Sequence, residues 1–315
     1  MVSNLHPVIE IRNLSKRYGR RTALNGINLS VPPGAIFGLV GRRGAGKSTL
    51  LKIMATLLTP SEGDVFIAGL SITGDRLPQV RQWIGYLPED FGVYPEQTCA
   101  EYIEFFAACY GVPPKERAPL AADLLQLVDL YHRKDTPADR LTPSMRHRLG
   151  IARILAHDPQ VLLLDETTKS LDPRARVETR ELLKELSGMG KTIVITSSNL
   201  AEVQDICTHA AIMEAGQITQ AGSLDEILAV APCHRNITIK FLGDARLAMN
   251  LIKACRGVVD VRLPAESGVS SDALTSIALL KELRVRFDGA YADASALLRS
   301  LMHSGVQVVT FAEES

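Results

Sequence analysis

The sequence predicts an α/β protein with a mainly parallel sheet covered on both faces, followed by a smaller α/β unit. Three observations support this fold class. Short apolar segments such as Val161–Leu164 and Thr192–Thr196 alternate with segments of helical apolar spacing. Apolar strands of this kind are typical of parallel sheets, whose two faces are both buried. The composition changes near Val230-Ala231-Pro232, so we place the two units at residues 1–231 and 232–315.

The elements of the first unit follow in chain order. Val8–Ile11 alternates apolar and polar residues, and Ile27–Val31 ends at Pro32-Pro33-Gly34, so both are expected to be strands. Further strands are expected at Ile36–Val40, Asp64–Ile67 (an edge strand), Val161–Leu164 and Thr192–Thr196, with a hairpin of Ala210–Met213 and Gln217–Gln220. Helices are expected at Ser48–Leu58, in a helical region at about residues 95–150, and at Val177–Leu186.

The second unit shows the order strand, helix, strand, strand, helix, strand. This order is typical of the split βαβ, or ferredoxin-like, arrangement. The expected elements are Ile237–Phe241, Ala245–Cys255, Val258–Leu263, Leu283–Phe287, Ala294–His303 and Val306–Phe311, with a loop at Ala265–Ser276.

The composition excludes several classes of protein. The 35 Lys and Arg residues balance the 35 Asp and Glu residues, so charge gives no reason to expect nucleic acid as a partner. The five cysteines are scattered and include no Cys-x-x-Cys pair, which argues against a disulfide framework or a zinc site. We find no secretory signal and no stretch of about 20 apolar residues. Any membrane-spanning part is therefore expected in another chain.

A glycine-rich loop follows the third expected strand and matches the pattern G-x-x-x-x-G-K-[ST]. Backbone N–H groups of such a loop, together with a helix N-terminus, bind phosphate oxygens. Lys47 would reach the β- and γ-phosphates, and Ser48 would bind Mg²⁺. We therefore expect the chain to bind ATP with Mg²⁺, the alternative being a plain glycine turn before a helix. The residues expected to bind ATP here are Gly41, Arg42, Arg43, Gly44, Ala45, Gly46, Lys47, Ser48 and Thr49.

Two carboxylates, Asp165 and Glu166, follow the apolar strand Val161–Leu164. Open α/β sheets bind ligands at the carboxyl ends of their strands. We expect Asp165 to hold Mg²⁺, mostly through water, and Glu166 to polarise the water that attacks ATP. The alternative is a role in capping the next helix.

Besides these two motifs, four segments show a resemblance to a known family. They are Ser15–Gly19, Ile84–Glu89, Leu141–Arg148 and Ser170–Asp172. With them, the chain resembles the ATP-binding subunits of ATP-binding cassette (ABC) transporters, in particular bacterial exporter subunits made as separate chains with a small C-terminal domain. The resemblance covers about residues 7–230, and the tail more loosely. It implies a P-loop NTPase cassette with a RecA-like parallel core, an antiparallel β subdomain and a helical subdomain.

The family resemblance also implies partners. Two ABC subunits, identical or different, would dimerise head to tail, with each ATP between one subunit's glycine loop and the other's signature segment, here including Thr142 and Ser144. Tyr18 would stack on adenine, although seen alone it is an ordinary strand-end aromatic. Glu89 would bind Mg²⁺, and the loop around it would contact a separate transmembrane permease. The chain is expected in the cytoplasm, at the inner face of the membrane.

Three departures from the family pattern affect the expected activity. The signature, usually Leu-Ser-Gly-Gly-Gln, has Pro143, which lacks an N–H group, and Ser144, which adds a Cβ. The switch histidine is replaced by Ser198, which carries no positive charge. Glu89 stands where many relatives have Gln. The two arginines at 42 and 43 replace the usual Pro-Asn, either as solvated charges or as contacts to nucleotide or to the opposite subunit.

These departures lead to two open hypotheses on function. In the first, the chain is a transport ATPase subunit for export, with Lys47, Glu166 and Ser198 in catalysis and with slow hydrolysis. In the second, it is a regulatory clamp that binds ATP and hardly turns it over. A third class, ABC proteins that act on DNA or ribosomes, predicts two cassettes or basic tracts, and neither is present.

Overall fold

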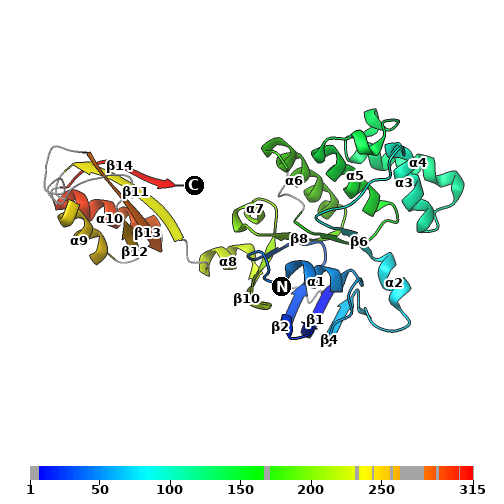
Figure 1. The fold of residues 1–315 in the computed structure, drawn as a ribbon, viewed down its shortest axis with the longest axis horizontal. Helices are drawn as coiled ribbons and strands as arrows, with labels where there is room; N and C mark the ends of the chain where they lie inside the picture. The colour runs from blue at the N-terminus through cyan, green and yellow to red at the C-terminus, as the bar shows by residue number, and fades with distance from the viewer. Residues whose placement is uncertain are drawn as a thin grey trace. The chain divides into compact units, whose positions relative to one another are not determined.

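The computed structural model describes residues 7–166, 171–230, 234–242, 245–255, 258–262, 280–288, 291–304 and 306–314. The chain forms two compact units, Met1–Ala229 and Val230–Ser315, each described here by itself (Figure 1). The position Ser170 of the expected Ser170–Asp172 segment and the loop expected at Ala265–Ser276 lie outside the described residues.

A six-stranded sheet is the centre of the first unit. Its strand order is β10-β9-β3-β8-β7-β6, with β10 antiparallel to β9 and the other neighbours parallel. The predicted α/β class with a mainly parallel sheet is confirmed. The strands are β3 (Ile36–Val40), β6 (Ile84–Leu87), β7 (Val161–Leu164), β8 (Thr192–Ser197), β9 (His209–Glu214) and β10 (Gln217–Ser223).

Both faces of this sheet are buried, because successive side chains of a strand point to opposite faces. In β3, Phe37 and Leu39 belong to one core, while Ile36 and Val40 belong to another. The first core also includes side chains of α1 (Lys47–Met54) and of a second sheet, which is antiparallel. The helical region covers the other face of the central sheet (Figure 1). The sheet is therefore the rigid base from which the loops after β3, β6, β7 and β8 project.

The second sheet of this unit is antiparallel, in the order β2-β1-β4-β5. The expected edge strand Asp64–Ile67 is wrong in its position, because β4 lies between β1 and the two-residue strand β5. Strands β1 and β2 are also longer than expected. Their pairing shifts register beyond Ile11, and a bulge breaks the simple alternation that marks a strand in a sequence. The bounds are β1 (Ile9–Tyr18), β2 (Arg21–Val31), β4 (Glu62–Ile67) and β5 (Leu70–Ser71).

The helical region contains α3 (Cys99–Cys109), α4 (Pro114–Leu127) and α5 (Pro143–Leu155). Helix α3 begins with a capping box between Thr98 and Glu101. Helix α5 begins at the signature segment, where the side chain of Thr142 accepts a hydrogen bond from the backbone N–H of Met145. The remaining helices of the unit are α2 (Leu77–Gln82), α6 (Pro173–Gly188), α7 (Leu200–Gln204) and α8 (Leu224–Val230), with short 3-10 turns at Tyr131–Arg133 and Ala138–Arg140.

The second unit is a four-stranded antiparallel sheet with two helices. Its order, β12-β13-β11-β14, is the arrangement expected of a split βαβ unit, so that prediction is confirmed. Ile237, Ile239 and Phe241 of β11 pack with Ala248 and Ile252 of α9 in its core. The elements are β11 (His234–Leu242), α9 (Ala245–Ala254), β12 (Val258–Arg262), β13 (Leu280–Asp288), α10 (Tyr291–His303) and β14 (Gln307–Glu314).

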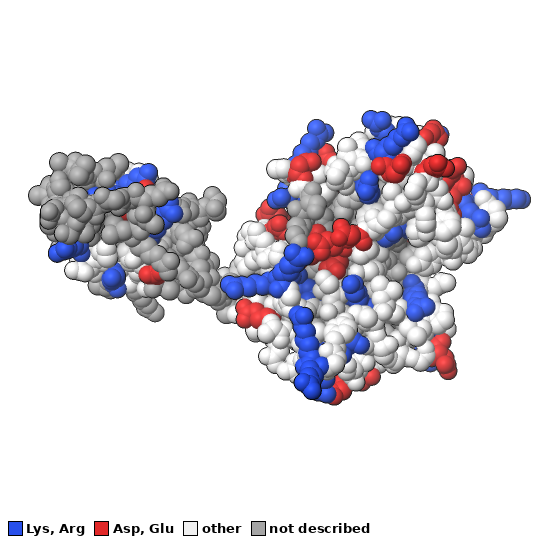
Figure 2. All heavy atoms as spheres, in the orientation of Figure 1, with Lys and Arg blue, Asp and Glu red and all other residues white. Residues whose placement is uncertain are grey.

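The described surface of the first unit mixes both signs of charge on the face shown in Figure 2. This mixture follows from the balanced composition of 35 basic and 35 acidic residues. Within the described part of the chain, no helix combines the length and the apolar character needed to cross a membrane.

Candidate nucleotide site

The glycine loop connects β3 to α1 and holds backbone geometry that glycine allows. Gly44 and Gly46 have φ values of 86° and 107°, in the region that other residues rarely occupy. A Cβ on Gly46 would lie 2.8 Å from the backbone oxygen of Ala23, so a side chain there would collide with the backbone. The loop ends at the start of α1, where backbone N–H groups and the helix dipole favour an anion.

A turn distant in the sequence supports this loop. The N–H of Gly216 donates to the backbone oxygen of Ala45 at 2.9 Å, and the Gly216 oxygen accepts from the N–H of Asn25 at 2.8 Å. The turn between β9 and β10 thus links the glycine loop to the antiparallel sheet. The sequence predicts the hairpin but contains no signal for this contact.

Lys47 is folded back into the loop. Its Nζ donates to the Gly41 oxygen at 2.7 Å and to the Arg42 oxygen at 3.4 Å. The same atom lies 3.0 Å from Oε1 of Glu166. The Lys47 and Glu166 side chains are only 5% and 9% exposed, so this ion pair is shielded from solvent.

Asp165 and Glu166 share one buried hydroxyl group. The Thr196 Oγ1 donates to Oδ1 of Asp165 at 2.7 Å and accepts from the Glu166 N–H at 2.8 Å. The Ser48 Oγ also donates to Oδ1 of Asp165, at 3.1 Å. Thr196 was not among the predicted site residues. The sequence signal that could have indicated Thr196 is its position as a polar residue at the carboxyl end of an apolar strand.

The oxygens of Ser48 and Asp165 fit Mg²⁺. This ion prefers oxygen ligands and usually keeps several waters, binding through one or two protein groups and the phosphates. No cluster of three or more His, Cys, Asp or Glu side chains suited to a metal occurs among the described residues, so a cage of protein ligands is not built there. Burial, together with the charge of Asp165, raises the pKa of Tyr86 to about 12, which keeps this neighbour uncharged.

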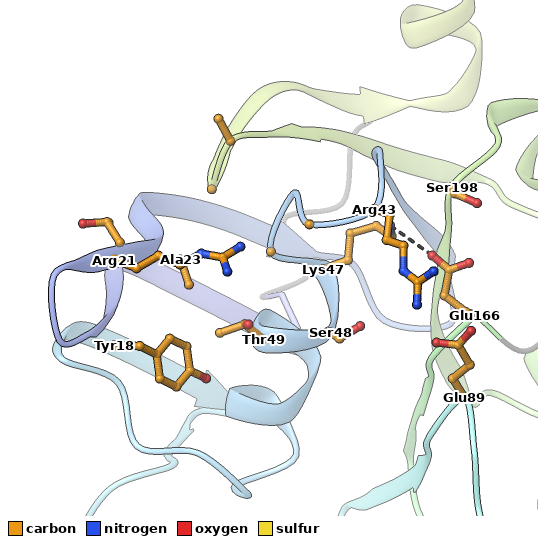
Figure 3. Close-up of a pocket in the computed structure, with 15 residues that line it drawn as sticks. Tyr18, Arg21, Ala23, Arg43, Lys47, Ser48, Thr49, Glu89, Glu166 and Ser198 are labelled. Carbon is orange, nitrogen blue, oxygen red and sulfur yellow. Dashed lines mark ion pairs between the residues drawn. The ribbon is translucent and has the colours of Figure 1, made fainter.

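The glycine loop and Glu166 line a cavity of about 820 Å³ (Figure 3), and Asp165 lies behind Ser48. Tyr18, 47% exposed, lies at one end of the cavity in the picture, and Glu166, Glu89 and Ser198 lie at the other. A volume of this size suits a ligand as large as a nucleotide. The lining residues are Tyr18, Arg21, Thr22, Ala23, Arg43, Gly44, Gly46, Lys47, Ser48, Thr49, Glu89, Glu166, Ser198, Ala215 and Gly216.

The signature residues do not line this cavity. Thr142 and Ser144 lie at the start of α5, where their hydroxyl oxygens are 3.2 Å apart. Arg42 is likewise absent from the lining. Gly41 and Ala45, which belong to the glycine loop, are buried and do not line the cavity either. The structure therefore joins the glycine loop with the two carboxylates and leaves the signature segment apart from them.

The loop that follows Glu89 packs onto α5. The ring of Phe91 covers Gly150, where a Cβ would lie 2.5 Å from the Phe91 Cζ atom. The Arg153 guanidinium lies 4.8 Å from the centre of the same ring. Arg153 also donates to the hydroxyl of Tyr102, which in turn donates to the Gly92 oxygen, both at 3.2 Å. Arg153 thus links this loop to α5 and α3.

A phosphate-binding loop, two carboxylates at a strand end and a parallel core define a nucleotide-hydrolysing ATPase of the P-loop class. The family model for "ABC transporter" matches residues 24–169. The chain is 34% identical to the methionine import ATP-binding protein MetN 1 of Burkholderia pseudomallei, over 83% of this chain and 77% of that protein. It is also 34% identical to the Nod factor export ATP-binding protein I of Cupriavidus metallidurans, over 70% and 73%.

Solved structures give the same result. The cbiO1 protein of Clostridium perfringens, part of the ABC transporter complex cbiONQ, matches with a TM-score of 0.66 and 28% identity, over 71% of this chain and 92% of that one. The dimeric cassette MJ0796, bound to ADP and Pi, matches with a TM-score of 0.62 and 27% identity, over 69% and 98%.

The chain therefore belongs to the ATP-binding subunits of ABC transporters. It is a transport ATPase that uses ATP with Mg²⁺, dimerises and works with a transmembrane permease. Its relatives include proteins named for import and for export.

Proposed function

We propose that this chain forms two composite ATP sites with a second ABC subunit and drives export through a separate permease. The observation that carries the proposal of composite sites is the separation of the signature segment from the cavity. The cavity contains Lys47, Ser48 and Glu166, whereas Thr142 and Ser144 lie at the start of α5 outside it. A second subunit, identical or different, supplies the missing half of each site.

Within one cavity, the residues divide the nucleotide between them. Tyr18 stacks on adenine, since its ring is exposed at one end of the cavity. The loop from Gly41 to Ser48 and the next residue, Thr49, bind the phosphates at the other end. Ser48, Asp165 and Glu89 hold Mg²⁺, which neutralises charge on the phosphate oxygens.

Hydrolysis requires a water molecule in line with the γ-phosphorus. The water oxygen forms a bond to that phosphorus while the bond to the bridging oxygen breaks, and its electron pair leaves with ADP. Glu166 orients the water and accepts its proton. Because Glu166 is paired with Lys47, a γ-phosphate that binds Lys47 competes with the carboxylate and releases it.

Turnover is slow in this proposal because the signature is weak. Pro143 offers no N–H to the γ-phosphate, and Ser144 places a Cβ where the family brings bare backbone. A lost hydrogen bond to a charged oxygen costs about 1.5–3 kcal/mol, which is a factor of about ten to a hundred. We expect purified protein to hydrolyse ATP more slowly than about 1 s⁻¹. Faster turnover that Glu166→Gln abolishes would refute slow hydrolysis.

The direction of transport is proposed as export, at the inner face of the cell membrane. The observation that supports it is an exporter subunit among the relatives. Methionine import is the second candidate. The MetN match covers 83% of the chain, which is more than the unit Met1–Ala229 alone contains.

Inside-out membrane vesicles distinguish the two directions, because they expose the ATP sites to added ATP. The chain is copurified with its permease and reconstituted into vesicles with the ATP sites facing outward. These vesicles are loaded with labelled methionine. ATP-driven loss of the methionine would support import and overturn export. Export predicts retained methionine, together with a metabolite that wild-type cells release into the medium and Glu166→Gln cells do not.

A further inference from the structure

The phosphate end of the cavity carries several acidic side chains. Glu166 and Glu89 line it, and Asp165 lies next to Ser48. Lys47 is already paired with Glu166 and bonded to two backbone oxygens. Ser198 is exposed at this end and is neutral. A cationic side chain in addition to Lys47 would stabilise the negative charge that develops on a γ-phosphate at this end.

Arg43 is the described cation that meets this need. It lies in the glycine loop, lines the cavity and is exposed. Its guanidinium makes no hydrogen bond or ion pair with any residue that the structure describes. In Figure 3 it extends toward the end of the cavity that holds Glu166 and Glu89.

The second arginine of the lining, Arg21, lies toward the other end of the cavity (Figure 3). Arg21 begins β2 and pairs across the turn with Tyr18. Tyr18 lies at the end of the cavity away from Glu166 (Figure 3). Arg21 is thus placed for the base or ribose, and Arg43 for the terminal phosphate.

We propose that Arg43 is a catalytic residue that binds the γ-phosphate oxygens and supplies the positive charge absent at Ser198. The inference rests on the proposed ATP site. While water adds to the γ-phosphorus and the electron pair of the broken bond leaves with ADP, negative charge spreads over these oxygens. A guanidinium offers them two parallel donors and a permanent charge. An arginine supplied within the same chain performs this service in other phosphoryl-transfer enzymes.

The test compares Arg43→Ala with Arg20→Ala. Arg20 is an exposed arginine of the nearby β1–β2 turn that does not line the cavity, so it controls for the loss of one positive charge. We expect Arg43→Ala to lower kcat by about 10²–10³. It should weaken ATP binding and leave ADP binding unchanged, since ADP lacks the γ-phosphate. Arg20→Ala should change none of these quantities.

A rescue experiment addresses the link to Ser198. Ser198→His should raise kcat at least about tenfold in the Arg43→Ala background and much less in wild type, where Arg43 already supplies the charge. Unchanged kcat in Arg43→Ala, equal weakening of ATP and ADP binding, or failure of the rescue would each overturn the inference. If wild type binds no ATP, the proposed function fails instead, and the role of Arg43 fails with it.

Discussion

The Nζ atom of Lys47 lies 3.0 Å from Oε1 of Glu166, and both side chains are almost completely buried. Each group therefore neutralises the other. Separating a buried ion pair is costly unless another charge takes the place of the lost partner. The phosphates of ATP provide that charge for Lys47. Binding of ATP and release of Glu166 for the attacking water are thus one event.

Glu166→Gln tests this exchange. The neutral amide competes less strongly for Lys47, so we expect ATP to bind several-fold more tightly while turnover falls by at least about 10². Equilibrium binding of a fluorescent ATP analogue and steady-state hydrolysis measure the two effects. Weaker binding of ATP by the variant would contradict the competition between the carboxylate and the phosphate.

Thr196→Val tests the hydroxyl that contacts both acids. Valine keeps the shape and removes the bonds to Asp165 and to the Glu166 N–H. Leaving these groups without their partner costs about 1–3 kcal/mol. We expect a five- to hundredfold higher Mg²⁺ requirement, or a comparable fall in kcat. Thr196→Ser, which keeps the hydroxyl, should stay within about threefold of wild type. Equal losses in both variants would indicate a packing effect.

The double substitution Pro143→Gly with Ser144→Gly should accelerate hydrolysis. It restores an N–H donor and removes a Cβ at the start of α5, so we expect turnover to rise about ten- to a hundredfold. The matched control is Pro114→Gly, which removes the first-turn proline of α4 and should leave turnover unchanged. If the double variant remains slow, the signature does not limit the rate.

The buried His147 predicts a pH dependence of stability. The residue is 9% exposed, both ring nitrogens lack a partner among the described residues, and burial lowers its pKa to about 4. Below about pH 6.5 the unfolded chain binds a proton that the folded chain does not. The free energy of unfolding should thus fall by about 2 kcal/mol from pH 7 to pH 5 and level off below about pH 4.

Urea unfolding followed by the fluorescence of Trp83, the single tryptophan, measures this dependence in the first unit. His147→Gln should remove the part of the pH-dependent fall in unfolding free energy that His147 causes. Burial also lowers the pKa of His157, but this residue is present in both proteins, so the difference isolates His147. An identical pH slope in the variant would contradict the prediction.

The sequence predicts the central sheet well because β3 and β7 are short, uninterrupted apolar strands with a recognisable loop at their ends. The bulged strand β1 extends beyond its predicted end because the bulges change the phase of the apolar pattern. Contacts between distant segments are a different matter. The support of Ala45 by Gly216 and the bond from Thr196 to Asp165 depend on which strands become neighbours, and a single sequence does not encode that order locally.

Helix α5 is capped by Thr142 at its start and has Arg153 in its last turn, and Arg153 and Gly150 contact the ring of Phe91. Its 13 residues form a rod about 20 Å long. Glu89, two residues before Phe91, belongs to the chain's own cavity, while we place Thr142 in the cavity of the other subunit. We therefore infer that α5 mechanically couples the ATP site of this chain to the ATP site that its signature segment completes. Their occupancies should be cooperative, with a Hill coefficient for ATP above one before any phosphate is released.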